Sequence, residues 1–557
     1  MMKVRVYLVL ILLFTSDLAA RWEPDRARNG MVVSQKALAS EIGLQVLKDG
    51  GNSIDAAVAT AFALAVTLPR AGNIGGGGFL MYRSAEGEVE AYDFRETAPA
   101  AAFPDMFLSN GEYDFDRHQY SGRSIGVPGT VAGLHLAWQE HGSLPWKRLV
   151  EPAIELARDG IVVSDDMERS LNKLLSRWKK HPASFEKYTR EGELYRMGET
   201  FIQPLLAETL QGIAEKGPNA FYEGKTAELI VAEVGRAGGF MTLDDLRKYK
   251  VKKRQPIRGT YRGFDIYSMP PPSSGGVTLV AMLNILEGFD ISKAGLQSAQ
   301  TLHLMAESMR RAFADRAQYL GDPDFNPNIP IKELTSKVYA SKLRQDIDPV
   351  RASESSAKFH ERNSQSRDTT HFSVVDKQRN AVSMTYTIEE PMMVVSGAGF
   401  LLNSELGDFN GAPGVTRENG LIGTDPNIAE PGKRPLSSMT PTIVARNGSL
   451  FMVTGSPGDR TIINTVLQTI VNAVDFNLNA QESVSLGRIH HQWLPDQIVY
   501  QQNGFSTDVL SLLQKMGHKL KPTPILGLAN IIIQRVDEGV LEGGTDLGYR
   551  DGRASGY

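Results

Sequence analysis

The chain has 557 residues, of which 41% are hydrophobic and 22% charged, and its formal net charge is −4. This is the composition of an ordinary soluble globular protein, without the strong positive charge that indicates general binding to nucleic acid or to an anionic membrane surface. Cysteine is absent. Disulfides, thiolate metal sites and a cysteine nucleophile are therefore excluded, and a large apolar core has to stabilise the protein.

The N-terminus has the three-part layout of a secretory signal. Lys3 and Arg5 precede an apolar run over residues 6–14, and small residues end the segment at Ala20. The apolar run is too short to span a bilayer. We therefore expect a signal peptide over residues 1–20 and a mature protein in the periplasm or the medium. A second apolar stretch, residues 54–68, is Ala-rich and is expected to be a buried helix, not a membrane span.

Periodicity predicts several elements in chain order. Leu38, Ile42 and Val46 mark one face of a helix over 34–47, which Gly50-Gly51 ends. Residues 55–68 are apolar all round and predict a central helix. Residues 73–82 run from four glycines into Phe-Leu-Met-Tyr, which predicts a turn that leads into a strand. Helical spacing returns over residues 130–141 and 299–317.

The composition changes over residues 345–367, which are polar and Ser-rich and predict an exposed, mobile segment. Two strands follow, with a turn over 377–380, and predict a hairpin. A mobile segment thus meets a buried hairpin at Asp368-Thr369, where the chain could be cut without unfolding.

A threonine at such a place could be a nucleophile. Threonine needs an adjacent base, and an N-terminal threonine supplies its own α-amine, whose unperturbed pKa of about 7.7 suits base catalysis near neutral pH. Taken alone, Thr369 is also compatible with an ordinary strand residue, because threonine is common in strands.

The surrounding segments resemble the gamma-glutamyltranspeptidase family over nearly all of the chain, from about residue 30 to Tyr557. The segments that carry the resemblance include Phe94-Arg95-Glu96, Gly126-Val127-Pro128-Gly129, Asp368-Thr369-Thr370-His371, Leu401-Leu402-Asn403, Asp408-Phe409, Arg434-Pro435-Leu436-Ser437-Ser438, Gly455-Ser456-Pro457-Gly458 and His490-His491-Gln492-Trp493.

This resemblance implies an α+β fold, a four-layer αββα sandwich of the N-terminal-nucleophile hydrolase type. It also implies self-cleavage into a large subunit, 21–368, and a small subunit, 369–557, that stay intertwined. The substrate would be a γ-glutamyl amide such as glutathione, and the acceptor water, an amino acid or a peptide. No cofactor or metal is implied.

The resemblance also implies a role for each site residue. Thr369 would attack the γ-carbonyl, Thr387 would hydrogen-bond the nucleophile, and the turn at Gly458 and Asp459 would present backbone N–H groups to the oxyanion. The α-carboxylate would be bound by Arg95, Ser437 and Ser438. The α-ammonium would be held by Asp408 and Glu405.

Three positions depart from the family pattern. Asp459 stands where a second glycine is common, and strain is expected there if the backbone requires positive φ. Glu389 replaces a usual Asn, in a stretch slightly shorter than usual. On a continuing strand its side chain would face the nucleophile; alternatively, the shortening swings it out to solvent. Residues 413–424 resemble a lid, with Asn419 in place of an aromatic residue.

Three other patterns are interpreted as structural. Gly122 to Gly126 fits a nucleophile-elbow pattern but lacks the strand and helix that the elbow needs. Gly75 to Gly78 lacks the residues of a phosphate loop. His490-His491 are adjacent and cannot chelate one metal from a strand. Two other functions stay open, a glutaryl or cephalosporin acylase on the same fold and a non-catalytic binding protein.

Overall fold

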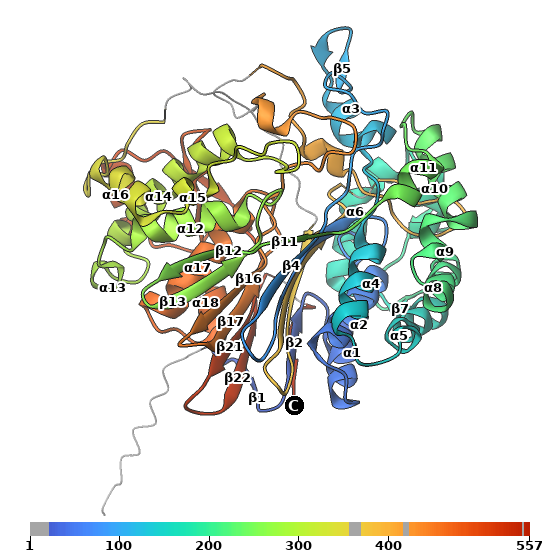
Figure 1. Cartoon of the computed structure of the whole chain (residues 1–557), viewed down its shortest axis with the longest axis horizontal. Coiled ribbons are helices and arrows are strands. Elements are labelled where there is room, and N and C mark those ends of the chain that lie inside the picture. The colour runs from blue at the N-terminus through green and yellow to red at the C-terminus, as the bar shows by residue number, and fades with distance from the viewer. Residues whose placement is uncertain (1–21, 356–368, 391, 416–422, 549–550) are drawn as a thin grey trace, which may run out of the picture.

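Two seven-stranded antiparallel sheets lie at the centre of the computed structural model, which describes residues 22–355, 369–390, 392–415, 423–548 and 551–557 (Figure 1). Sheet I has the order β11 (Lys252–Arg254), β4 (Val89–Phe94), β3 (Gly77–Arg83), β15 (Ala381–Thr387), β14 (Thr369–Val375), β2 (Met31–Ser34) and β23 (Arg553–Gly556). Sheet II has the order β1 (Asp25–Ala27), β22 (Val540–Thr545), β21 (Asn530–Arg535), β17 (Ser449–Gly455), β16 (Thr442–Arg446), β13 (Phe264–Ser268) and β12 (Ile257–Tyr261).

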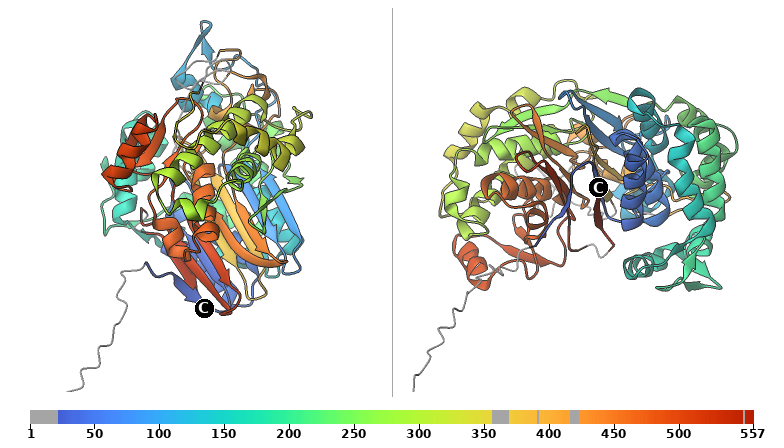
Figure 2. Two further views of the ribbon diagram at one scale, coloured as in Figure 1. Left: turned by 90° about the vertical axis from the view of Figure 1, so that its left-hand side faces the viewer. Right: turned by 90° about the horizontal axis from the view of Figure 1, so that it is seen from below.

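Helices cover the outer face of each sheet, as Figure 2 shows from below. Beside sheet I lie α1 (Ala37–Lys48), α2 (Ser53–Thr67), α4 (Thr130–His141), α5 (Trp146–Asp159), α8 (Pro204–Lys216), α9 (Asn219–Tyr222), α10 (Gly224–Arg236) and α11 (Leu243–Lys248). Beside sheet II lie α12 (Gly275–Leu286), α14 (Ala299–Tyr319), α15 (Ile331–Leu334), α16 (Lys337–Gln345), α17 (Thr461–Asp475) and α18 (Ala480–Ser485).

Three apolar cores hold these layers together. One joins sheet I to its helices through residues such as Phe62 and Tyr386, and another joins sheet II to its helices through residues such as Met309 and Ile470. Between the sheets lies a third core that includes Phe79 and Val453. Each sheet buries both faces, so the arrangement is the expected αββα sandwich.

The strands of sheet I interleave segments from both sides of position 368. β14 lies between β15 and β2, and β15 lies between β14 and β3. Sheet II likewise combines β12 and β13 with β16 and β17. A cut between residues 368 and 369 would therefore leave two chains that share both sheets.

Most of the predicted elements are present. α2 is buried over its whole length, as its all-apolar pattern predicts, and α4 has the predicted bounds. α1 begins at Ala37 and not at Ser34, because Ser34 ends strand β2 and Lys36 is extended. β14 and β15 form the predicted hairpin. The predicted signal peptide and residues 356–368 of the linker lie outside the described residues.

The described part of the linker is exposed over most of residues 346–351, but it is then anchored. The Ser353 backbone N–H donates to Glu307 at 3.1 Å, and the Ser355 N–H donates to Asp496 at 3.0 Å. The expectation of a mobile segment is therefore wrong for residues 353–355. Among the described residues, no helix combines the length and the apolar character needed to cross a membrane.

Candidate active site

The first residue of β14 is paired with the last residue of β15. The register places Thr369 opposite Thr387 and His371 opposite Thr385. The Thr369 hydroxyl donates to Thr387 Oγ1 at 3.3 Å, and both side chains are buried. Two β-branched residues favour this extended backbone. The candidate nucleophile therefore begins a central strand, with a second hydroxyl beside it.

His371 connects this end of sheet I to sheet II. Its Nδ1 lies 2.8 Å from Thr385 Oγ1, and a Cβ on Gly455 of β17 would lie 2.4 Å from the imidazole. Burial lowers the pKa of His371 to about 3, so the ring is neutral at physiological pH. His371 thus fixes the strand that carries Thr369 without adding a charge.

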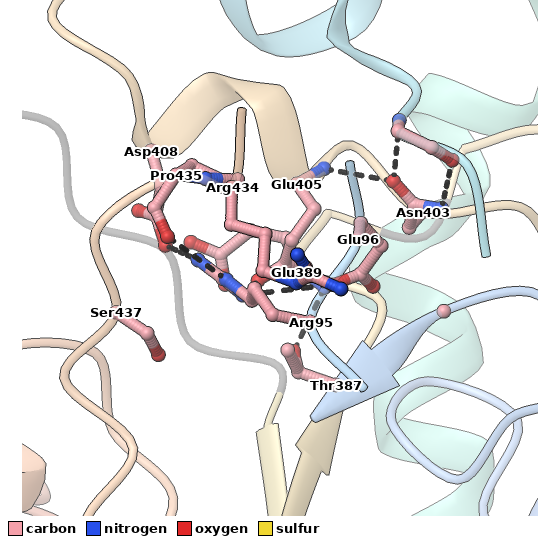
Figure 3. Close-up of polar contacts among 12 residues, drawn as sticks. Arg95, Glu96, Thr387, Glu389, Asn403, Glu405, Asp408, Arg434, Pro435 and Ser437 are labelled. Atoms are coloured by element: carbon pink, nitrogen blue, oxygen red, sulfur yellow. Dashed lines mark hydrogen bonds and ion pairs between the residues drawn. The ribbon is translucent and has the colours of Figure 1, made fainter. Parts of the chain in front are cut away.

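Arg95 binds the two carboxylates of a short 3-10 turn, η2 (Glu405–Asp408). It directly follows β4, and its guanidinium donates to Glu405, to Asp408 at 2.5 Å and to the Pro435 carbonyl at 3.3 Å. Residues three apart in a 3-10 turn lie on the same side, so Glu405 and Asp408 face one cation together. Figure 3 shows this cluster beside the strand end that carries Thr387.

Asn403 fixes the position of that turn. Its amide donates to the carbonyls of Gly75 and Gly126, and its Oδ1 accepts the backbone N–H of Gly126 at 2.9 Å and of Glu405 at 3.1 Å. Three segments far apart in the sequence therefore meet at one amide side chain. This contact explains structurally why the Gly126 and Asn403 segments belong to the resemblance.

The cation and the acidic pair, which were expected to hold opposite charges of one substrate, contact each other. Burial would lower the pKa of Arg95, but Glu405, Asp408 and Glu96 together raise it. Burial raises the pKa of Glu405 to about 7, although Arg95 opposes this. Burial also raises the pKa of Glu96, and Glu405 adds to the effect. The cluster is thus a buried ion-pair network that carries more acidic than basic groups.

The expectation that the strand continues to Glu389 is wrong. β15 ends at Thr387, and Glu389 has a φ of 57°, so the strand does not reach it. Its backbone N–H donates to Thr387 Oγ1 at 2.9 Å. The alternative of a solvent-facing side chain is also wrong, because Glu389 is 6% exposed and lies near enough to Arg95 to raise its pKa. The cause is a fold-back of the shortened segment, where the Ser404 N–H binds the Ile388 carbonyl at 3.0 Å.

Ser437 and Ser438 are buried and are held by donors. The Met439 N–H donates to Ser437 Oγ at 3.1 Å, and Arg316 Nη2 donates to Ser438 Oγ at 3.0 Å. Arg316 also donates through Nε to Ser274 Oγ at 2.8 Å. Sequence reasoning missed Arg316 and Ser274. The available signal was that Arg316 lies three and four residues from the apolar Phe313 and Ala312 on one helix, where a solvated charge is unexpected.

The turn at Gly458 and Asp459 joins β17 to α17 and has positive φ at both residues, 127° and 51°. The Thr461 N–H donates to the Gly458 carbonyl at 3.0 Å. The expected strain at Asp459 is confirmed, because an L side chain in this region carries a steric cost. Burial raises the pKa of Asp459 to about 7; Arg460 opposes the shift and Asp408 adds to it. Asp459 therefore belongs electrostatically to the acidic side of the site.

The structure agrees with the structural interpretation of the elbow-like, glycine-rich and double-histidine patterns. Ser124 lies in a 3-10 turn, η1 (Gly122–Ser124), and donates to the Ser121 carbonyl at 2.6 Å. A Cβ on Gly76 would lie 2.0 Å from the Thr387 carbonyl, so these glycines allow close backbone packing beside the site. His490 Nδ1 lies 2.7 Å from Asn464 Nδ2, and His491 Nε2 lies 3.2 Å from Asp496.

One buried cluster has the residue types of a metal site, namely His303, Glu307 and His518. Glu307 is already bound by Arg310 and Arg311, and His303 Nδ1 lies 2.8 Å from His518 Nε2. Two neighbouring guanidiniums disfavour a bound cation. The cluster is a polar core, and its Glu307 also anchors Ser353. The candidate active site uses none of its residues.

Residues 416–422 of the segment that resembles a lid, Asn419 among them, lie outside the described residues. The described residues on both sides of them are in contact, because the Gly414 N–H donates to the Gly423 carbonyl at 2.9 Å. Asn410 Nδ2 donates to the Thr424 carbonyl at 2.6 Å, which joins this segment to the end of η2.

Comparisons with known proteins agree with this arrangement. The model of the gamma-glutamyltranspeptidase family matches residues 39–557. The glutathione hydrolase proenzyme of Escherichia coli K12 is 46% identical over 548 residues, 96% of this chain and 93% of that protein. The corresponding protein of Bacillus subtilis 168 is 38% identical, over 96% of this chain and 91% of its own length.

Two solved structures are also similar. A cephalosporin acylase from Bacillus halodurans superposes with a TM-score of 0.84 and 25% identity, covering 99% of both chains. The gamma-glutamyltranspeptidase of Helicobacter pylori is 43% identical with a TM-score of 0.56, over 57% of this chain and 91% of that one. With the family match over residues 39–557 and the site described above, the chain belongs to the gamma-glutamyltranspeptidase family.

Proposed function

We propose that the protein is a self-processing γ-glutamyltransferase and glutathione hydrolase, and that Thr369 is its nucleophile. The observation that carries the proposal is the Thr369–Thr387 pair at the start of a central strand, next to buried groups of both charge signs. A γ-glutamyl group carries an ammonium and a carboxylate on one carbon. An arginine and two carboxylates in contact match those two charges.

Processing is the first reaction. The Thr369 hydroxyl attacks the carbonyl carbon of residue 368, and the C–N bond breaks as the Thr369 nitrogen takes up the hydroxyl proton. Water then hydrolyses the resulting ester, which frees the carboxylate of residue 368 and the Thr369 hydroxyl. This gives a large subunit that ends at residue 368 and a small subunit from Thr369 to Tyr557. Support comes from the shared sheets, because strands of both parts pair along β14 and β15 and would hold the cut chains together.

The same hydroxyl then acts on substrate. The free α-amine of Thr369 accepts the hydroxyl proton while Oγ1 bonds to the γ-carbonyl carbon. Backbone N–H groups of the turn at Gly458 and Asp459 stabilise the oxyanion. The leaving amine takes up the proton and departs, which leaves a γ-glutamyl ester on Thr369. Water, or the amine of an amino acid or peptide, attacks this ester and regenerates the hydroxyl.

Substrate recognition is an exchange of ion-pair partners. In the structure Arg95 is paired with Glu405 and Asp408. A bound γ-glutamyl group brings its carboxylate to Arg95 and its ammonium to the two acidic residues, so each charge keeps an opposite partner. A buried charge left without a partner is costly, so substrates that lack one of the two charges bind less well. No cofactor or metal is needed for these steps.

Export through the signal peptide of residues 1–20 is part of the proposal. It is supported by the basic, apolar and small-residue pattern of that segment. Protein sequencing of the exported large subunit is expected to start near Arg21. Retention of Met1 on exported protein would show that the segment is not a cleaved signal.

The decisive assay compares three anilides that differ at one carbon. The γ-glutamyl anilide carries both charges, the glutaryl anilide lacks the ammonium, and the 4-aminobutyryl anilide lacks the carboxylate. We expect the γ-glutamyl anilide to be cleaved fastest. An acylase for glutaryl or cephalosporin side chains is the second candidate, because the fold superposes over 99% of a cephalosporin acylase. Faster cleavage of the glutaryl anilide would establish that candidate instead.

A further inference from the structure

The charge of Arg95 is already matched twice in the structure. Glu405 and Asp408 bind its two terminal nitrogens, and Glu96 lies 3.8 Å from Nη1. A substrate carboxylate reaches Arg95 only by displacing Glu405 and Asp408 from it. Attraction of the substrate carboxylate therefore calls for a second cation on the side of Ser437 and Ser438.

Arg316 is such a cation. It lies on α14, is 6% exposed, and points its Nε and Nη2 at the hydroxyls of Ser274 and Ser438. Both partners are neutral, and within the described ranges no carboxylate lies at ion-pair distance from Arg316. Its guanidinium carbon lies 5.9 Å from the centroid of the Phe313 ring. The carboxylates that favour its charge, those of Asp459 and Asp408, lie beyond ion-pair distance, so an anion bound beside the two serines would stabilise the buried guanidinium.

The hydrogen-bond directions around the two serines leave donors available. A hydroxyl has one hydrogen to donate. Ser438 Oγ accepts from Arg316, and Ser437 Oγ accepts from the Met439 N–H. Neither hydroxyl donates to another described residue within hydrogen-bond distance. Two adjacent O–H groups therefore remain to donate to an anion such as a carboxylate.

Arg316 also fixes the backbone that carries these serines. Ser274 Oγ accepts from Arg316 and donates to the Ser437 carbonyl at 2.6 Å, and the Ser274 N–H binds the same carbonyl at 2.7 Å. One guanidinium thus holds Ser438 directly and Ser437 through Ser274. Burial lowers the pKa of Arg316 to about 9; Arg460 adds to this shift, and Asp459 and Asp408 oppose it. Arg316 therefore stays charged at neutral pH.

We propose that Arg316 is the positioning residue of the carboxylate site: it orients the Ser437 and Ser438 hydroxyls through direct and Ser274-mediated hydrogen bonds. It also adds a second positive charge to that of Arg95, which is paired with Glu405 and Asp408 before substrate binds. This inference rests on the proposed function. Arg316 then determines the selectivity for acyl groups that carry the α-carboxylate of a γ-glutamyl group. It acts through the serines and does not contact the scissile bond.

The test measures kcat/KM for the γ-glutamyl, glutaryl and 4-aminobutyryl anilides in Arg316→Gln, after a gel has shown two subunits. We expect a loss of about 10- to 100-fold for the two substrates with the carboxylate and little change for the third, because a charge-assisted contact is removed. Arg262→Gln is the control. It removes a partly buried arginine in the turn between β12 and β13, which binds Asp475 at the end of α17, and it should not change the ratio of the three rates.

A double-mutant cycle with Ser438→Ala tests whether Arg316 acts through Ser438. If Arg316 acts through Ser438, the losses of the two single variants are not additive in the double variant. Should Arg316→Gln remain unprocessed, Arg316→Lys and Ser274→Ala serve instead, and both are expected to show smaller selective losses. A parallel fall for all three anilides, or additive losses, would overturn the inference.

A binding measurement separates this inference from the proposed function. The dissociation constants of L-glutamate and 4-aminobutyrate are determined by calorimetry for the wild type and Arg316→Gln. Weaker binding of glutamate alone supports the inference even if the wild type fails to cleave γ-glutamyl anilide, in which case only the proposed function is wrong. Equal binding of glutamate to both proteins contradicts the inference even if the enzyme is active.

Discussion

The strand-built and loop-built halves of the site differ in what fixes them. Thr369, Thr387 and His371 lie on adjacent strands, where antiparallel register sets their positions and neutral hydrogen bonds join them. Glu389, just after β15, and Glu405 and Asp408, on the turn η2, meet around a buried arginine. Under the proposed function, the bond-making step belongs to the ends of two central strands, and the choice of substrate belongs to an electrostatic cluster that responds to ligand and pH.

The largest loss of activity is expected from a substitution in the strand-built half. Thr369→Ala removes the attacking hydroxyl, so we expect one uncut chain and no γ-glutamyl hydrolysis, and Thr369→Ser should be cut more slowly. A denaturing gel and an anilide assay measure both. Thr370→Ala is the matched control, because this neighbour is buried and its hydroxyl has no hydrogen-bond partner among the described residues. Cleavage of Thr369→Ala at the same bond would show that another group performs it.

The next largest loss of activity is expected from Arg95→Ala, in the loop-built half. It removes a charge-assisted contact worth about 1.5–3 kcal/mol, or about 10- to 150-fold in kcat/KM for γ-glutamyl substrates. Processing should remain intact, because the strands that carry Thr369 and Thr387 are untouched. Arg123→Ala, which removes a guanidinium bound to the Met106 carbonyl, should leave kcat/KM near the wild-type value. A processing defect as large as the substrate defect would mean that the two halves are not separable.

The pH dependence of KM is expected to come from the loop-built half of the site. Burial raises the pKa of Glu405 and of Asp459 to about 7 in each case. As pH falls through 7 these carboxylates take up protons and lose their attraction for the substrate ammonium, so KM should rise. Glu389→Asn removes a negative charge beside Arg95 and should move the midpoint of this rise to lower pH while activity persists. Glu390→Gln is the control, because Glu390 pairs with Arg177. Superimposable profiles of wild type and Glu389→Asn would remove Glu389 from substrate recognition.

The smallest effect concerns backbone strain in the loop-built half. Asp459→Gly relieves a non-glycine residue with positive φ, and we expect it to raise the free energy of unfolding by about 1 kcal/mol. Thermal unfolding of the mature protein measures this. Asn447→Gly, at a φ of 50° in the turn between β16 and β17, gives the gain from the same backbone change away from the site. A lower melting temperature in Asp459→Gly alone would show that the carboxylate stabilises the turn.

Sequence pattern predicted the strand-built half well. An apolar run predicted α2, helical spacing predicted α4, and two strand-like runs around a turn predicted the β14–β15 hairpin, because these patterns follow directly from local geometry. The register then follows from the turn over residues 377–380. Thr369 and Thr387 therefore lie together as expected.

For the loop-built half, the sequence predicted which residues take part but not how they contact one another. The resemblance named Arg95, Glu405 and Asp408, but their mutual ion pairs depend on Asn403 joining three distant segments, which no local pattern encodes. The strand rule failed at Glu389 because a fold-back ends β15 two residues earlier. Arg316 was missed because a single basic residue in a helix is ordinarily solvated.

The account depends most on Thr369 as the N-terminal, acylated residue of a small subunit. Mature enzyme is mixed with a γ-glutamyl substrate, quenched in acid within one turnover, and analysed by intact and peptide mass spectrometry. We expect a chain that begins at Thr369 and gains the mass of one glutamyl group on its N-terminal peptide, with no gain in Thr369→Ala. A small subunit that starts at another residue, or a glutamyl group attached elsewhere, would contradict the account.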